Sequence, residues 1–154
     1  MKASPILLDT NLLLLFVVGT ASLEYVAKHK KLTEFTQEDY DTLKGLISRS
    51  PLVLLTPNTL TETSNLAAYI GEPARSVIFE VLRAIIVKSQ EVYIASRTAA
   101  ERSEFIRLGL TDASLVEAST DEVAILTTDL DLYLAALAKG SPAVNFNHLR
   151  DGYL

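Results

Sequence analysis

The stretch Pro5-Ile6-Leu7-Leu8-Asp9-Thr10-Asn11 begins with a short apolar run and ends in polar residues. A second apolar run, Leu12 to Val18, follows directly and continues to Gly19. The simplest interpretation is a buried strand that leads through a polar turn into a helix. This pattern predicts the first strand and helix of an α/β fold, with Asp9 at the carboxyl end of the strand.

The same pattern recurs along the chain. Further strands are predicted at residues 52–55, 91–95 and 122–127, with an edge strand at 143–146. One helix opens at Thr36, where Asp39 completes a capping box, and ends near Ser48. The other predicted helices span residues 59–70, 74–88, 97–108, 111–119 and 130–139. Alternating strands and helices predict a three-layer α/β/α sandwich with a central, mainly parallel sheet of about four to five strands.

Composition limits the class of protein. With 154 residues, 49% of them hydrophobic, the chain is expected to form a single domain over residues 1–154. A net charge of -5 argues against general coating of nucleic acid, so any such contact must be local. The absence of cysteine excludes disulfides, zinc sites built from thiolates and cysteine nucleophiles. The apolar run 12–18 is far shorter than the roughly 20 residues that cross a bilayer, so a cytoplasmic protein without a membrane partner is expected.

Acidic residues follow the predicted strands. Asp9 and Asp129 come directly after two of them, Glu62 lies in the helix after the second strand, and Asp112 opens another helix. Each residue alone has an ordinary explanation, because Asp is a preferred N-cap and Glu a preferred first-turn residue. Together they indicate a ligand site, because ligands of open parallel α/β sheets bind outside the carboxyl ends of the strands.

Convergence of these acids requires a neutralising partner. Two like charges about 4 Å apart repel by roughly 4 kcal/mol at an effective dielectric constant near 20. A hard divalent cation relieves this repulsion, and Mg²⁺ or Mn²⁺ suits carboxylate and water oxygens better than zinc does. The sequence therefore predicts a Mg²⁺ or Mn²⁺ site formed by Asp9, Glu62, Asp112 and Asp129.

Four segments resemble, in order, the motifs of the PIN-domain ribonucleases. They are Ile6-Leu7-Leu8-Asp9-Thr10-Asn11, Thr61-Glu62, Gly109-Leu110-Thr111-Asp112-Ala113-Ser114 and Ile125-Leu126-Thr127-Thr128-Asp129. The resemblance implies a PIN-like fold and metal-dependent hydrolysis of phosphodiester bonds in single-stranded RNA, with the four acids as catalytic residues and metal ligands. It also implies that Asn11 and either Thr127 or Thr128 orient those ligands. Asp131 fits either an outer ligand or a solvated residue in the first turn of a helix, and the second reading is favoured.

Substrate contacts are less defined. Lys28-His29-Lys30-Lys31 is the one basic run, which either grips RNA phosphates or forms a solvated loop. Arg97 is a further candidate, and Arg75 and Arg102 have weaker support. His29 and His148 are expected on the surface, outside the catalytic site. The first helix is so apolar that it must be either deeply buried or part of a homodimer surface.

Several functional readings stay open. Small stand-alone proteins that resemble this chain are frequently toxins, which an antitoxin protein inhibits by inserting a peptide into the acidic groove. An RNA-processing nuclease and a catalytically inactive binding module are the alternatives. A flavodoxin-type receiver domain is also considered, but it requires paired acids near the first strand and a lysine after the last, and neither is evident. Residues 20–50 exceed what a minimal member of the family needs, and their role in substrate or partner choice is open.

Overall fold

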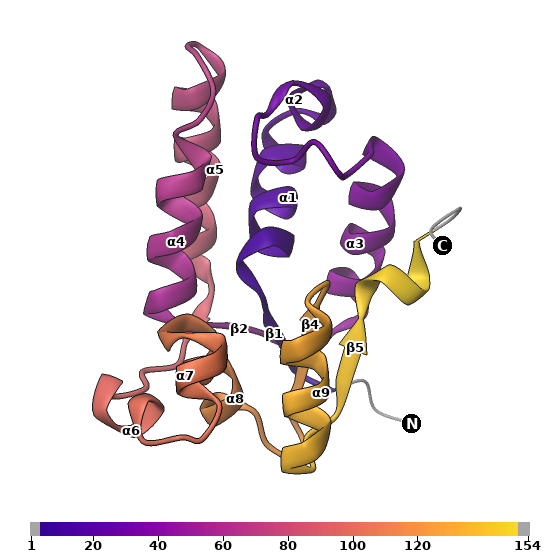
Figure 1. Ribbon diagram of the computed structural model, residues 1–154. Coiled ribbons are helices and arrows are strands. Elements are labelled where there is room, and N and C mark those ends of the chain that lie inside the picture. The colour runs from indigo at the N-terminus through magenta and orange to yellow at the C-terminus, as the bar shows by residue number, and fades with distance from the viewer. Residues whose placement is uncertain (1–3, 151–154) are drawn as a thin grey trace.

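A five-stranded parallel sheet with helices on both faces forms the centre of the computed structural model, which describes residues 4–150 (Figure 1). The strands are β1 (Ile6–Leu8), β2 (Val53–Leu55), β3 (Gln90–Glu91), β4 (Ala124–Thr127) and β5 (Ala143–Asn145). Their order across the sheet is β3-β2-β1-β4-β5, and every neighbouring pair is parallel. The predicted three-layer α/β/α sandwich is therefore confirmed.

Helices connect the strands and cover the sheet. They are α1 (Thr10–Ala21), α2 (Leu23–Lys28), α3 (Gln37–Arg49), α4 (Pro57–Ala67), α5 (Ala74–Lys88), α6 (Ser96–Ala100), α7 (Phe105–Leu108), α8 (Leu110–Ala118) and α9 (Leu130–Lys139), with a 3-10 helix, η1 (Phe146–Leu149), near the end. The predicted capping box of α3 is present, because Thr36 and Asp39 each accept a hydrogen bond from the other's backbone N–H. Among residues 4–150, no helix combines the length and apolar character needed to cross a membrane.

The strands divide their side chains between two cores, because successive residues of a strand point to opposite faces. Leu8, Leu55 and Leu126 pack with the helices from α1 to α5. Their neighbours Leu7, Leu54 and Ile125 pack with α8 and α9 on the other face. Figure 1 shows α1, α3, α4 and α5 on one side of the strands and α8 and α9 on the other.

Helix α1 lies inside the first of these cores. Its residues from Leu12 to Leu15, together with Val17 and Val18, are fully buried, as expected for a helix that is apolar on all sides. Gly19 allows close packing here, because a Cβ atom at this position would lie 2.1 Å from the ring of Tyr40. Of the two roles considered for this helix, deep burial is the one observed.

Three sequence-based predictions differ from the structure. The expected helix 97–108 is two short helices, α6 and α7, because the chain turns at residues 101–104 and Ile106 is 90% exposed, which leaves no continuous apolar face. The strand expected at 91–95 is limited to Gln90–Glu91. Helix α2 was not predicted; it lies within the long segment 20–50 and buries only Val26.

The strand order creates a topological switch beside β1. The chain passes from β1 to β2 and β3 on one side, and then returns to β4 on the other side of β1. Open α/β sheets bind ligands in the crevice at such a switch, outside the carboxyl ends of the strands. The order also differs from the 2-1-3-4-5 order of flavodoxin-like domains, which excludes the receiver-type alternative.

Candidate functional site

The register of β1 and β4 brings Asp9 next to Thr127. Leu8 pairs with Leu126, and the backbone N–H of Asp9 donates to the carbonyl of Leu126 at 3.1 Å. The buried Thr127 hydroxyl donates to Asp9 Oδ2 at 2.5 Å, and it accepts from the backbone N–H of Asp129 at 2.9 Å. One hydroxyl therefore fixes the relative position of two predicted site residues.

Asp9 and Asp129 are also the N-caps of α1 and α9. Asp9 Oδ1 accepts from the N–H of Thr10 at 2.7 Å, and Asp129 Oδ1 accepts from the N–H groups of Asp131 and Leu132 at 2.8 and 3.2 Å. The ordinary explanation of these residues as caps is thus correct. A cap can also have a functional role, because capping fixes the position of the carboxylate. In Asp129, only Oδ1 takes part in the cap, and Oδ2 accepts no hydrogen bond from residues 4–150.

Glu62 reaches the same region from α4, which packs against both α1 and α8. Thr10 Oγ1 donates to Glu62 Oε1 at 3.2 Å, and Thr111 Oγ1 donates to Oε2. Sequence reasoning missed both threonines. The available signal was their position in the chain, because Thr10 follows Asp9 and Thr111 precedes Asp112.

The charges of neighbouring acids raise the pKa of Asp9 and of Asp112. Burial raises the pKa of Asp112 to about 7, and the charges of Asp9, Asp129 and Glu62 add to this effect. Burial also raises the pKa of Asp9, against the opposing hydrogen bonds from Thr127 and Thr10, and the charges of Asp129 and Glu62 raise it further. The structure therefore brings the four predicted acids into one region of negative potential.

The part of the chain that the structure describes offers these acids no basic partner in an ion pair. None of the ion pairs among residues 4–150 includes Asp9, Glu62, Asp112 or Asp129. Within the same residues, no three acidic or histidine side chains lie close enough together to hold a metal ion as they stand. The chemistry of the donors fits Mg²⁺ or Mn²⁺, since all are carboxylate oxygens, and Mg²⁺ commonly binds through one or two carboxylates while it keeps several waters. Fewer than three direct ligands therefore suffice.

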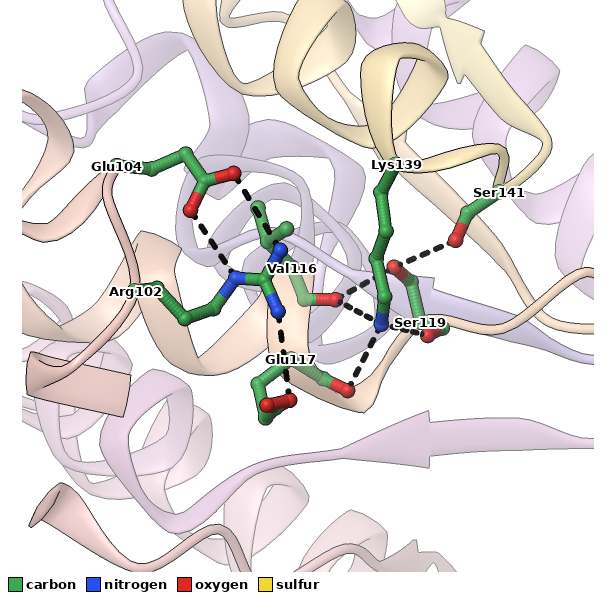
Figure 2. Close-up of polar contacts among 7 residues, drawn as sticks. All are labelled: Arg102, Glu104, Val116, Glu117, Ser119, Lys139 and Ser141. Atoms are coloured by element: carbon green, nitrogen blue, oxygen red, sulfur yellow. Dashed lines mark hydrogen bonds and ion pairs between the residues drawn. The ribbon is translucent and has the colours of Figure 1, made fainter. Parts of the chain in front are cut away.

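Helix α8 presents Thr111 and Asp112 in its first turn and is held at both ends. It starts after Gly109, whose φ of 85° and ψ of 177° are essentially restricted to glycine. At its C-terminal end, Lys139 Nζ donates to the carbonyls of Val116, Glu117 and Ser119 (Figure 2). A cation that binds the last carbonyls of a helix stabilises that end.

Arg102 belongs to the same anchor. Its guanidinium pairs with Glu104 at 3.0 Å and with Glu117 at 3.5 Å (Figure 2). The charge of Arg102, a weaker candidate for RNA contact, is therefore engaged within the protein. Arg97 is exposed on α6 and forms no ion pair with any residue from 4 to 150.

The residues expected to orient the ligands differ in their contacts. Thr127 binds Asp9 as described above. Asn11 is exposed on α1, and Asp131 is exposed in the first turn of α9, where its backbone N–H donates to the N-cap side chain of Asp129. Thr128 accepts from Asn147 Nδ2 at 3.3 Å through its carbonyl. Among residues 4–150, the side chains of Asn11, Thr128 and Asp131 form no hydrogen bond with the four acids.

The basic run lies away from the acids. Lys28, Lys30 and Lys31 are exposed, and Lys31 Nζ sits 4.4 Å from the ring centroid of Tyr69, just beyond the C-terminal end of α4. Glu62, the acid on α4, lies seven residues before Tyr69, which corresponds to about 10 Å along a helix at 1.5 Å per residue. Within residues 4–150, no ion pair joins this run to Asp9, Glu62, Asp112 or Asp129.

The expectation that His29 lies on the surface is wrong. His29 is 1% exposed, its Nε2 lies 3.2 Å from the carbonyl of Ala67, and its Nδ1 accepts from the N–H of Lys31. Because Nδ1 accepts, Nε2 carries the proton and the ring is neutral. Burial lowers the pKa of His29 accordingly. The ring is buried because it joins the end of α2 to the end of α4, whereas His148 is exposed as expected.

Comparisons of the chain with protein-family models, with curated proteins and with solved structures found no match. The class of protein is therefore defined by its fold and site: a parallel α/β sandwich with four acidic residues gathered near its topological switch.

Proposed function

We propose that the protein is a Mg²⁺- or Mn²⁺-dependent endoribonuclease that hydrolyses phosphodiester bonds in single-stranded RNA. The main support is the group of four acidic residues: burial and the charges of Asp9, Asp129 and Glu62 raise the pKa of Asp112 to about 7, and no member of the group forms an ion pair within residues 4–150. Carboxylates that perturb one another in a crevice are a feature of functional sites. The resemblance of the four sequence segments to PIN-domain ribonucleases supplies the reaction and the substrate class.

Each residue has a distinct part in this proposal. Asp9, Glu62, Asp112 and Asp129 would hold the ion, in part through its bound waters, and the ion when bound would neutralise charge on the phosphate oxygens and activate water. Thr127 keeps Asp9 and Asp129 at a fixed separation, while Thr10 and Thr111 hold Glu62. One carboxylate of the group can accept the proton of the attacking water. The water oxygen bonds to phosphorus as the opposite P–O bond breaks.

Cleavage of labelled RNA tests this proposal directly. The purified protein should cut a single-stranded RNA with Mn²⁺ or Mg²⁺ present, should cut its duplex more slowly, and should be inactive in EDTA. Asp9→Asn and Asp112→Asn should each lower the rate by at least about 100-fold, since metal-assisted stabilisation is worth several kcal/mol. Asp121→Asn is the matched control, because Asp121 is exposed and precedes the opposite end of β4. Activity in EDTA, or full activity in both site variants, would contradict the proposal.

The cellular role that we propose is that of the toxin in a toxin–antitoxin pair, by analogy with the small proteins that the chain resembles. Expression in a bacterial host should then stop growth, and Asp9→Asn or Asp112→Asn should restore it. An RNA-cleaving protein whose expression leaves growth unchanged would instead indicate a processing nuclease. A protein that binds RNA without cutting it would indicate an inactive binding module.

A further inference from the structure

A surface hollow of about 510 Å³ adjoins the acidic region. Glu62, one of the four acids, lines the hollow together with Thr111, whose hydroxyl donates to Glu62. Asn58 and Thr61 line it from the first turns of α4, Tyr93 from the loop after β3, and Ser96 from the start of α6. Its size lies within the range of about 300–1,000 Å³ that is usual for small-molecule sites.

The lining combines an exposed aromatic ring with free polar groups. Tyr93 is 75% exposed, and its hydroxyl donates to Glu91 Oε1 at 3.2 Å. Asn58, Thr61 and Ser96 line the same hollow, and their side chains form no hydrogen bond with any residue from 4 to 150. An amide, two hydroxyls and an aromatic ring are thus available to a ligand beside the acids.

The charge of the lining favours an uncharged ligand. Of the residues that the structure describes, no lysine, arginine or histidine lines the hollow, and Glu62 is the one carboxylic acid in its lining. A phosphate group would therefore meet repulsion without a compensating cation. A nucleobase suits the lining, because proteins bind unpaired RNA bases by stacking them on aromatic side chains and by hydrogen bonds to their edges.

We infer that this hollow binds a nucleobase of the substrate next to the phosphate that is cleaved, and that Tyr93 and Asn58 give the enzyme a base preference. The inference rests on the proposed ribonuclease function, because it requires that a phosphate occupy the neighbouring acidic region. Tyr93 provides the stacking surface, and the Asn58 amide, which can both donate and accept, reads the edge of the base.

Titration of the isotope-labelled protein with each of the four ribonucleoside 5′-monophosphates, followed by NMR, tests the inference without cleavage. At least one of them should shift the signals of Asn58, Ile94 and Ser96, whereas ribose 5-phosphate, which lacks a base, should not. Tyr93→Ala should weaken this binding about 5- to 150-fold, which corresponds to stacking worth about 1–3 kcal/mol per base. Tyr69→Ala is the matched control, because Tyr69 is another exposed aromatic residue, located past the far end of α4.

Several outcomes would overturn the inference: equal shifts with ribose 5-phosphate, shifts confined to another surface, or equal affinities of Tyr93→Ala and Tyr69→Ala. A second measurement compares cleavage of single-stranded RNAs that differ at one base. The wild-type enzyme should prefer one base, and Tyr93→Ala should lose that preference through a higher KM. If the wild-type protein cuts no RNA, the proposed function fails but the titration still decides the base site. If it cuts RNA while the nucleotides cause no shift at the hollow, only the base site fails.

Discussion

Thr127 shows how a single residue can organise the acidic region. Its fully buried hydroxyl donates to Asp9 and accepts from the backbone N–H of Asp129. It therefore connects the carboxyl ends of β1 and β4. If a buried carboxylate loses such a donor, the free energy spent on removing it from water is no longer offset by the hydrogen bond. Thr127 therefore contributes both to stability and to the position of the acids.

Thr127→Val removes the hydroxyl and keeps the shape of the side chain. We expect it to lower the free energy of unfolding by about 1.5–3 kcal/mol, the usual value for a hydrogen bond to a charged group. Mn²⁺ affinity should fall about 10- to 100-fold, as when a residue that orients a metal ligand is lost. Thr127→Ser retains the hydroxyl and serves as the control. Denaturant unfolding and calorimetry measure both effects, and equal Mn²⁺ affinities of the two variants would refute the role given to the hydroxyl.

Asp112 should make the stability of the ion-free protein depend on pH. Its pKa is raised from 3.8 to about 7 in the folded state, so the folded protein binds the proton more tightly than the unfolded chain does. The resulting stabilisation is complete below about pH 4 and is lost as the pH rises through 7.

Asp112→Asn keeps this position neutral at every pH. In EDTA, the variant should match the wild-type protein at pH 4 and exceed its stability at pH 8 by about 1–3 kcal/mol, a value reduced for the partial exposure of Asp112. At about 2–4 °C per kcal/mol for a chain of this size, Tm should rise by several degrees. Asp121→Asn should show no such trend. A gain for Asp112→Asn that is the same at both pH values would show that Asp112 is not the titrating group.

At the scale of elements, α8 determines where Thr111 and Asp112 lie. The helix depends on Gly109, which adopts a backbone conformation that other residues rarely reach. A Cβ atom at Gly109 would meet no neighbour within 4 Å, so any cost of a substitution there comes from backbone strain alone.

Gly109→Ala should lower the free energy of unfolding by about 1–3 kcal/mol, because alanine is strained in this backbone conformation. It should also weaken Mn²⁺ binding, because relief of the strain moves the first turn of α8. Gly45→Ala is the matched control: Gly45 lies within α3 without positive φ, and a Cβ atom there also meets no neighbour. The free energy of unfolding of Gly45→Ala should rise by about 0.5–1 kcal/mol, since alanine favours a helix. Thermal unfolding of the pair decides between strain and a general effect of the added methyl group; equal changes in Tm would contradict the role of Gly109.

Elements with clear boundary signals were predicted best from the sequence. The bounds of α5 and α9 match the predictions, because Pro73 precedes the first and Gly140, with a φ of 94°, ends the second. The helix expected at 97–108 failed because the ion pairs of Arg102 hold a turn that local periodicity does not reveal. Asp9 and Asp129 could be predicted from the sequence as helix caps that follow strands. The roles of Thr10 and Thr111 could not be predicted, because these residues bind Glu62 across 52 and 49 residues of chain.

For the whole molecule, the strand order is the decisive feature. Placing β1 between β2 and β4 brings together carboxylates from residues 9, 62, 112 and 129. Local patterns predict the strands, β3 only in part, but they do not predict this order, which depends on how the crossovers pack. The burial of His29 was missed for the same reason, since its partner Ala67 lies 38 residues away in the chain.

Calorimetric titration with Mn²⁺ tests most directly whether this convergence creates an ion site. The wild-type protein should bind Mn²⁺, with an affinity that rises with pH as Asp112 loses its proton, and should gain about 2.7 kcal/mol of stability at 100 times Kd. The double variant Asp9→Asn/Asp112→Asn should remain folded by circular dichroism and show no binding heat, while Asp121→Asn should bind like the wild type. A heat of binding that persists unchanged in the folded double variant would show that these carboxylates do not hold the ion.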